Sequence, residues 1–106
     1  MPEAGVPAGD SPVSAVEVYR TGRNKAAFTF DSEIGANWQH DVGKVQVDEA
    51  TRTITIPWRV YRPNIPSLGN GLLSYNGRDF RLPEGTWKVH LTDAITGRVL
   101  KRSTVH

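Results

Sequence analysis

Three histidines are the residues of this sequence that could bind a metal ion. They are His40, His90 and His106, and no two of them have the HxH or HxxxH spacing of metal-binding motifs. A zinc or copper site needs about three ligands that converge on one point. The chain contains no cysteine that could supply a thiolate ligand. We therefore interpret the histidines as scattered surface residues, and we predict no metal site and no cofactor.

Paired carboxylates could support acid–base catalysis of the kind that cleaves glycosidic bonds. Asp31 and Glu33 form one close pair, and Asp48 and Glu49 form another. Asp48 and Glu49 fall in a predicted turn, where aspartate is common because its side chain bonds to the local backbone. Asp31 and Glu33 could bind a cation together with Asp41, but we interpret them as residues of a solvated loop.

Motifs of nucleophilic and phosphate chemistry are absent from the sequence. It contains no GxSxG motif, no glycine-rich phosphate-binding loop and no EF-hand pattern. Because there is no cysteine, a thiol nucleophile is excluded as well. We therefore predict that the chain is not an enzyme and has no catalytic residue.

The aromatic residues are the better candidates for binding. Trp58 and Trp87 fall on apolar faces of predicted strands, so we expect them in the core. Tyr19, Tyr61 and Tyr75 fall on outer faces or in loops, where a ring can stack on a sugar or anchor a protein interface. The 13 Lys and Arg residues against 11 Asp and Glu residues give a formal charge of +2. This positive bias is too small to indicate nucleic acid as a partner.

Alternating apolar and polar residues predict the β-strands that would position these side chains. The clearest pattern spans residues 53–61, where every second side chain is apolar. Residues 45–48 precede it across a short polar connection, so the two segments are expected to form a β-hairpin. Residues 31–43 could form a single helical turn, or a loop that places Trp38 at the end of the core. Further strands are predicted at residues 14–20, 26–30, 80–82, 86–92 and 99–105.

The apolar faces of these strands predict the hydrophobic core, because a two-layer β-structure buries one face of each sheet. Without disulfides, this core must supply the stability of the domain. The residues expected to be buried are Phe28, Phe30, Val45, Val47, Ile54, Ile56, Trp58, Val60, Trp87, Val89 and Leu91.

Several residues predict where strands are interrupted or lie at an edge. Asn76-Gly77 is a strong hairpin signal, because both residues tolerate a positive φ. Pro57 cannot donate a backbone hydrogen bond, so its strand is expected to lie at a sheet edge or to be bulged there. The interspersed charges of residues 99–105 are typical of an edge strand that is protected against aggregation.

The end of the chain resembles the closing hairpin of immunoglobulin-like domains from bacteria and phages. Residues 84–93 read EGTWKVHLTD and residues 96–100 read TGRVL, which is the pattern of glycine, aromatic residue, alternating strand, aspartate, glycine and return strand. The resemblance implies a β-sandwich with an adhesive, spacer, decoration or chaperone-like role. The Cys–Trp–Cys spacing of antibody domains is absent, so only the architecture carries over.

The length of 106 residues fits a single domain. Residues 1–12 contain three prolines and two glycines and are predicted to be a flexible lead or linker, followed by one domain at residues 13–106. No apolar run approaches the ~20 residues of a membrane span, so we expect no direct membrane insertion. The predicted fold is all-β: an immunoglobulin-like, two-sheet antiparallel β-sandwich of about seven strands.

The predicted binding site is the long connection that follows the strand at residues 53–61. Long ordered loops in compact domains are often functional. Pro63, Pro66, Gly69 and Gly71 are expected to keep this connection out of a regular sheet. Its apolar residues could contact a partner or cap the end of the sandwich. The predicted binding residues are Tyr61, Arg62, Ile65, Leu68, Leu72, Leu73 and Tyr75.

The predicted function is that of a non-catalytic protein-interaction or structural module, such as a part of an envelope or virion assembly. Its partner would be another protein or further copies of the chain. The alternative is a carbohydrate-binding module that uses exposed aromatic residues. The sequence leaves the cellular location open, with an extracytoplasmic or virion-associated place as the expectation.

Overall fold

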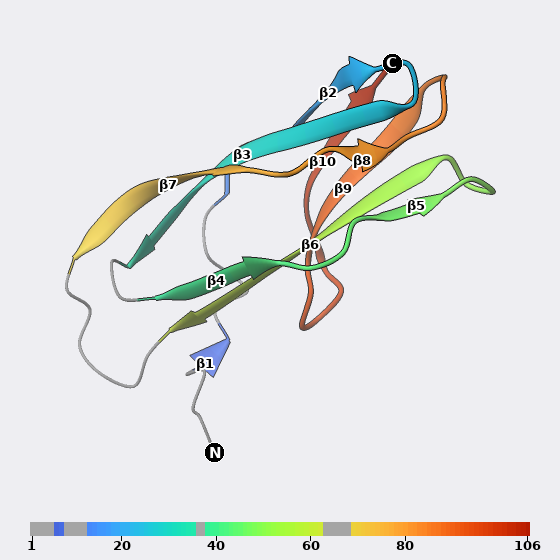
Figure 1. Cartoon of the computed structure of the whole chain (residues 1–106). Helices are drawn as coiled ribbons and strands as arrows, with labels where there is room; N and C mark the ends of the chain where they lie inside the picture. The colour runs from blue at the N-terminus through green and yellow to red at the C-terminus, as the bar shows by residue number, and fades with distance from the viewer. Residues whose placement is uncertain (1–5, 8–12, 36–37, 63–68) are drawn as a thin grey trace.

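The computed structural model describes residues 6–7, 13–35, 38–62 and 69–106, and these residues form strands and connections without a helix (Figure 1). Two β-sheets pack against each other, so the predicted all-β chain with two sheets is confirmed. The strands are β1 (Val6–Pro7), β2 (Glu17–Gly22), β3 (Lys25–Gly35), β4 (Gln39–Val42), β5 (Gln46–Asp48), β6 (Thr53–Arg62), β7 (Asn70–Asn76), β8 (Phe80–Arg81), β9 (Trp87–Asp93) and β10 (Val99–Val105).

Sheet A is the larger layer and is built around β6. Strands β4 and β5 lie end to end along one edge of β6, while β9 and then β10 lie on its other side. Of the predicted lead at residues 1–12, the structure describes only Val6 and Pro7, which pair with the end of β6 as β1. The rest of that lead lies outside the described residues.

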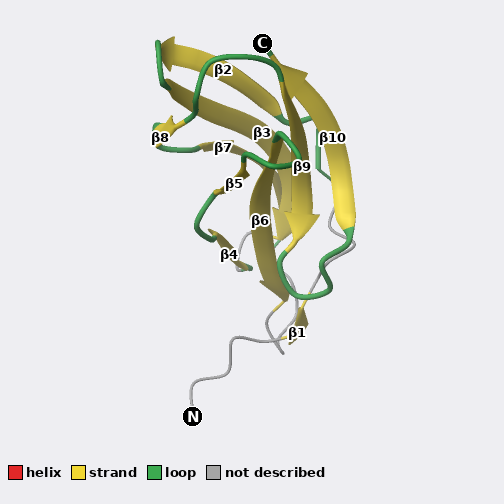
Figure 2. Ribbon diagram, turned by 90° about the vertical axis from the view of Figure 1, so that its right-hand side faces the viewer, coloured by secondary structure: helices red, strands yellow, loops and turns green. Residues whose placement is uncertain are grey.

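Sheet B is the smaller layer and is built around β3. Strand β2 pairs with one edge of β3, and β7 and β8 lie end to end along the other edge. Figure 2 shows the two layers from the side, with β2 and β3 in one layer and β6, β9 and β10 in the other. The interruptions at residues 43–45 and 77–79 divide two long edges into four strands. This division is one reason why ten strands are described where about seven were predicted.

Strands β6 and β9 run parallel, with Thr53 opposite Lys88 and Trp58 opposite Asp93. Every other strand pair of the described residues is antiparallel. The prediction of a purely antiparallel sandwich is therefore wrong at this pair. Parallel neighbours need a crossover connection. Here the chain leaves sheet A after β6, forms β7 and β8 in sheet B, and returns as β9.

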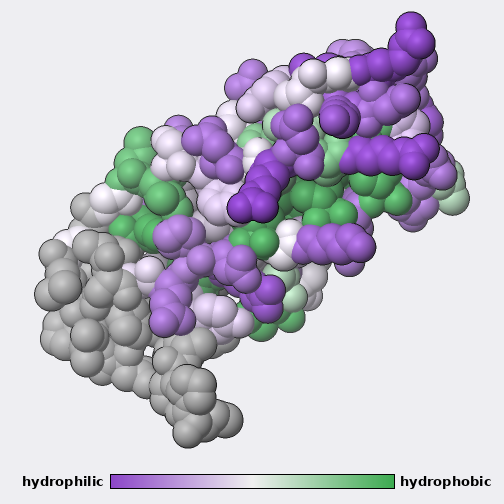
Figure 3. Space-filling view, viewed as in Figure 1, coloured by the Kyte–Doolittle hydropathy of each residue, from purple (hydrophilic) through white to green (hydrophobic). Residues whose placement is uncertain are grey.

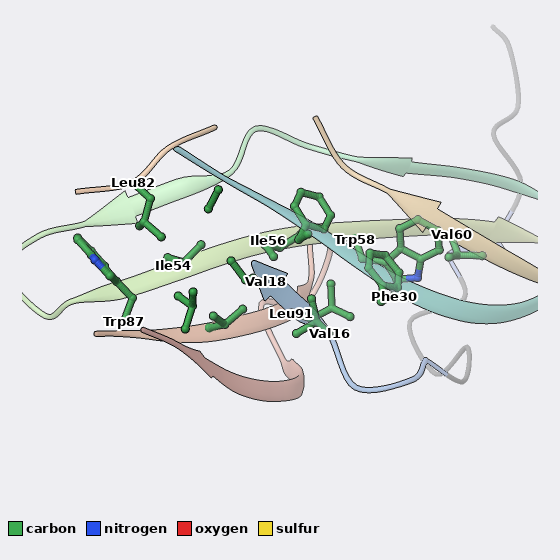
Figure 4. Close-up of a cluster of buried hydrophobic side chains, with 14 of the residues drawn as sticks. Val16, Val18, Phe30, Ile54, Ile56, Trp58, Val60, Leu82, Trp87 and Leu91 are labelled. Carbon is green, nitrogen blue, oxygen red and sulfur yellow. The ribbon is translucent and has the colours of Figure 1, made fainter. Parts of the chain in front are cut away.

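The predicted core is confirmed except at Val45 and Val47. These two valines are only half-buried, because Val47 lies on the edge strand β5 and Val45 lies in the connection that precedes it. Figure 4 shows how side chains from both sheets meet between the layers. The core also contains residues that were not in the predicted set, namely Val16, Val18, Ala26, Ala27, Ile34, Leu82 and Val105.

The hairpin predicted at Asn76-Gly77 is wrong. The chain does not reverse there, because β7 and β8 both pair antiparallel with the same edge of β3. A Cβ atom at Gly77 would overlap the ring of Phe28. Glycine is needed at this position because the backbone passes directly over an aromatic side chain, and not because the chain turns.

Pro57 lies in the central strand of sheet A, so the alternative of an edge strand is wrong. The interruption is in the neighbouring edge: β5 pairs with β6 as far as Thr55, and β4 pairs with it from Trp58 onward. Opposite Pro57, the amide of Gly43 donates to the Pro57 carbonyl at 2.9 Å. The nitrogen of Pro57 faces this interrupted edge, where a donor is least needed.

The two remaining predictions concern the end of the chain and residues 31–43. Strand β10 forms an edge of sheet A, as predicted from its charges. Residues 31–43 form no helical turn within their described part, since β3 continues to Gly35 and β4 begins at Gln39. Trp38 is half-buried and packs against the core. The predicted loop is therefore wrong for most of the described part of this segment, which belongs to β3 and β4, whereas the expected contact of Trp38 with the core is present.

Candidate functional site

The predicted binding segment does not stay out of the sheets. Arg62 is the last residue of β6, and residues 70–76 form β7, paired antiparallel with β3. The expectation that Gly71 keeps this connection out of a regular sheet is wrong, because Gly71 lies within β7 and has no positive φ. Gly69, with a φ of 120°, precedes the strand, and Pro63 and Pro66 lie outside the described residues. Ile65 and Leu68 lie outside the described residues.

Tyr75 belongs to the packing between the sheets and is not a free surface ring. Its ring centroid lies 5.6 Å from that of Phe30, 5.9 Å from that of Trp58 and 6.0 Å from that of Phe28. Leu73 is also half-buried and packs against the core. The inward face of β7 therefore stabilises the fold, and Leu73 and Tyr75, both half-buried, are less open to solvent than the prediction of binding residues expected.

Leu72 is the predicted site residue that is most open to solvent, with 73% of its surface exposed. It lies on β7, whose only described partner strand is β3. The seven residues of β7 include no charged side chain. The other described edge strands of more than two residues, β2, β4, β5 and β10, each contain at least one. Strand β7 therefore lacks the charges by which edge strands commonly avoid pairing.

The backbone groups of Leu72 and Ser74 point toward the free edge of β7. The amide of Gly77 donates to the carbonyl of Phe28 at 2.8 Å, in the same register that pairs Phe30 with Tyr75. Antiparallel pairs alternate between hydrogen-bonded and non-hydrogen-bonded pairs. Counting back from Gly77 leaves Leu72 and Ser74 in non-hydrogen-bonded pairs, so their amides and carbonyls face outward.

A groove of about 700 Å³ opens between the two interrupted edges, β4 and β5 of sheet A and β7 and β8 of sheet B. We call it the lateral groove. Figure 3 shows apolar surface between charged side chains on this side of the molecule. Its apolar lining comes from Phe28, Val42, Val45, Val47, Tyr75 and Phe80. The charged residues of its lining are Lys44, Arg78, Asp79 and Arg81.

The positive charges of the lateral groove outnumber its single negative charge. Asp79 also accepts a hydrogen bond from the hydroxyl of Thr21 at 3.2 Å, so one oxygen of its carboxylate already has a partner within the chain. A basic surface next to half-buried apolar side chains favours partners that carry both acidic and apolar groups. The sequence alone did not indicate this surface, because Lys44 and Arg81 come together only through the packing of two sheets.

A second, smaller pocket of about 460 Å³ lies at the junction of β4 and β6. We call it the Trp38 pocket. Across it, Arg59 Nη2 lies 3.2 Å from Asp41 Oδ2, and the two residues are opposite each other in the β4–β6 register. Tyr61, a predicted binding residue, lies opposite Gln39 and is half-buried. The pocket is lined by Trp38, Gln39, His40, Asp41, Arg59 and Tyr61.

The histidines lie apart from one another in the fold. The His40 ring lies 5.7 Å from the Trp58 ring, and His106 Nδ1 lies 3.2 Å from the hydroxyl of Thr86. His90 is half-buried on β9, so it is less exposed than a surface residue. Within the described part of the chain, no three metal-ligating side chains come together.

The carboxylates that were considered for catalysis have local partners. Asp31 accepts a hydrogen bond from the hydroxyl of Ser74 at 2.7 Å and is part of β3, so it does not lie in a loop. Asp48 accepts a hydrogen bond from the amide of Ala50 at 3.0 Å, as expected for a turn aspartate. Both carboxylates therefore have a structural role in the fold.

The chain matches no protein-family model, no curated protein and no solved structure. The part of the chain that the structure describes contains no helix that is long and apolar enough to cross a membrane.

Proposed function

We propose that this chain is a non-catalytic protein-interaction module that binds an extended segment of a partner protein as an added strand. The observation that carries this proposal is the edge of β7 that pairs with no described strand; β7 has seven residues and no charged side chain. An exposed sheet edge offers a row of unpaired amides and carbonyls, and peptides bind such edges by forming main-chain hydrogen bonds.

The added strand would lie beside β7 and cover the lateral groove. Residues Tyr75 and Asn76 belong both to β7 and to the lining of the groove. A partner strand on this edge therefore projects every second side chain toward the apolar lining. Acidic residues of the same strand would lie near Lys44, Arg78 and Arg81. We infer that the partner segment alternates apolar and acidic residues.

An immunoglobulin-like architecture is part of this proposal, because the closing hairpin resembles that of such domains. Two stacked sheets with free edges suit an adhesive or assembly role in an envelope or a virion. The parallel β6–β9 pair distinguishes this chain from the antiparallel sheets of immunoglobulin domains. Strand addition does not depend on that pair, since β7 belongs to the other sheet.

A peptide of alternating valine and glutamate tests the proposal, with a valine–lysine peptide as the control. Fluorescence anisotropy should detect binding of the acidic peptide, with weaker binding at high salt, because salt screens exposed charges. The lysine peptide should bind at least about tenfold less tightly. Equal binding of both peptides would contradict the inferred charge preference.

Two variants of the same residue test the role of the strand edge. Leu72→Pro removes an amide that points away from β3, and proline is tolerated at such edge positions. Leu72→Thr removes the same apolar side chain but keeps the amide. We expect Leu72→Pro to lose peptide binding while Leu72→Thr keeps most of it, and both to remain folded by circular dichroism. If Leu72→Pro binds the peptide as well as the unchanged chain, strand addition at β7 is refuted.

A second copy of the chain could also occupy the free edge, and sedimentation velocity separates this outcome. If the unchanged chain dimerises at micromolar concentration and the Leu72→Pro variant stays monomeric, the edge of β7 binds a second copy of the chain and not an acidic partner.

A further inference from the structure

We propose that the Trp38 pocket is a binding site for a neutral saccharide. This site is separate from the strand-addition surface, because the Trp38 pocket and the lateral groove share no lining residue. The volume of about 460 Å³ lies within the range of small-ligand sites, about 300–1,000 Å³. Its lining combines half-buried rings with polar side chains on adjacent strands.

The polar groups of the pocket suit hydroxyl groups. A sugar hydroxyl both donates and accepts hydrogen bonds, so it is recognised by neighbouring donors and acceptors. Asp41 and Arg59 supply one acceptor group and one donor group on facing strands, held by a contact of 3.2 Å. Gln39 can do both through its side-chain amide. Because the charges of Asp41 and Arg59 oppose each other, the pocket favours a ligand without net charge.

The aromatic residues of the pocket can pack against the apolar face of a sugar ring. Trp38 and Tyr61 are both half-buried, so each ring is held by the fold and still presents surface. Trp38 packs against the core on one side. Tyr19 is more exposed, at 43%, but lines neither the Trp38 pocket nor the lateral groove. Tyr19 therefore provides a matched control for Tyr61.

A proline-rich peptide is the main competing ligand, because aromatic grooves also bind such segments. The polar groups that an extended proline-rich backbone offers are mostly carbonyl acceptors, since proline lacks an amide proton. Arg59 could donate to these carbonyls, but Asp41 would have no donor to bind. A saccharide uses both members of the pair, and for this reason we favour it.

Collisional quenching of tryptophan fluorescence gives a direct measurement of the pocket. Trp58 and Trp87 are 2% and 1% exposed, so acrylamide should quench mainly Trp38. The probes are neutral oligosaccharides, selected from a neutral glycan array on which the full chain is first screened, and a proline-rich decapeptide. A bound saccharide should protect Trp38 from the quencher.

Three variants test whether the saccharide binds in the Trp38 pocket. Tyr61→Ala should weaken saccharide binding about tenfold, Asp41→Asn should weaken it as well, and Tyr19→Ala should leave it unchanged. Circular dichroism confirms that each variant is folded. The proposal is overturned if no neutral glycan is retained, or if Tyr61→Ala and Asp41→Asn both bind as the unchanged chain does. Protection of Trp38 by the proline-rich peptide alone would assign the pocket to peptides instead. Because the strand-addition test uses Leu72 variants and charged peptides, either proposal can fail without the other.

Discussion

Trp58 and Trp87 are both buried in the core, but their indole N–H groups differ in their partners. Trp87 Nε1 donates to the Pro83 carbonyl at 3.0 Å, and the Arg52 guanidinium carbon lies 4.3 Å from the centre of its ring. Trp58 Nε1 is buried without a hydrogen-bond partner among the described residues. Replacing either residue by alanine should cost about 3–5 kcal/mol, because a large cavity is left.

Replacing each tryptophan by phenylalanine measures how much the N–H group of each indole contributes to stability. Trp87→Phe loses a buried hydrogen bond and weakens the contact with Arg52, whereas Trp58→Phe removes a donor for which the described residues provide no acceptor. We expect Trp87→Phe to lower the free energy of unfolding by about 1–2 kcal/mol more than Trp58→Phe does. Urea denaturation measures both values. A larger loss for Trp58→Phe would show that its N–H is satisfied in solution.

The second prediction concerns two glycines near the same edge of sheet B. An added Cβ at Gly77 would overlap the Phe28 ring, whereas an added Cβ at Gly71 meets no atom within 4 Å. Gly77→Ala should therefore destabilise the fold by about 1–3 kcal/mol. Gly71→Ala should be neutral or slightly stabilising, because alanine restricts the unfolded chain. Thermal denaturation of both variants tests this difference, and equal melting temperatures would contradict it.

At the scale of elements, strict alternation was the clearest signal for a strand, although the less regular strand β10 was predicted as well. Strands β6 and β9 were recognised because an apolar residue occurs at every second position, and these apolar side chains are buried in the core. Strand β7 was missed, because exposed Leu72 breaks the alternation and Gly71 resembles a loop residue. An edge strand takes its conformation from its neighbour, here β3, and that pairing joins residues distant in the sequence.

The candidate sites depend on the same distant pairings. Asp41 and Arg59 face each other only because β4 pairs with β6 in one register. The lateral groove requires edges from both sheets. Tyr61 was predicted as a binding residue because the alternation of its strand places it on the outer face, and this can be read from the local sequence. That Trp38 and Asp41 line the same pocket as Tyr61 could not be predicted, because only the folded structure brings them together.

The third prediction compares β9 with β10 by amide hydrogen exchange. Strand β9 has β6 on one side and β10 on the other, whereas β10 is an edge of sheet A. Amides of β9 should be protected throughout. In β10 every second amide from Lys101 to Val105 should exchange rapidly, because one side of an edge strand faces solvent. Uniform protection of β10 would mean that another strand covers this edge in solution.

At the scale of the whole molecule, the two sides of the sandwich differ. On one side the edge strands β2 and β10 lie next to each other, and Figure 2 shows them meeting near the C-terminus. On the other side the interrupted edges leave the lateral groove open. On the side where β2 and β10 meet, the Arg20 side chain links the two sheets by hydrogen bonds; we call this the closed side. The Arg20 guanidinium donates to the carbonyls of Leu82, Pro83 and Gly85 at 2.7, 2.8 and 3.0 Å, and to that of His106 at 3.4 Å.

The last prediction tests whether Arg20 joins the two sheets. It projects from β2 of sheet B, and its acceptors lie in the connection to β9 and after β10, which belong to sheet A. Lysine cannot reproduce the planar set of donors of arginine. Arg20→Lys should therefore lower the free energy of unfolding by about 1–3 kcal/mol.

Arg23→Lys is the matched control for Arg20→Lys. Arg23 makes an ion pair with Glu84 at 3.3 Å, and their side chains are 83% and 68% exposed. Exposed ion pairs contribute little to stability, so this variant should be nearly neutral. Urea denaturation of both variants, with exchange of the β2 and β10 amides, measures the difference. If Arg20→Lys is as stable as Arg23→Lys, the closed side depends on the apolar contacts of Val18 and Val105, both of which belong to the core, and not on the guanidinium.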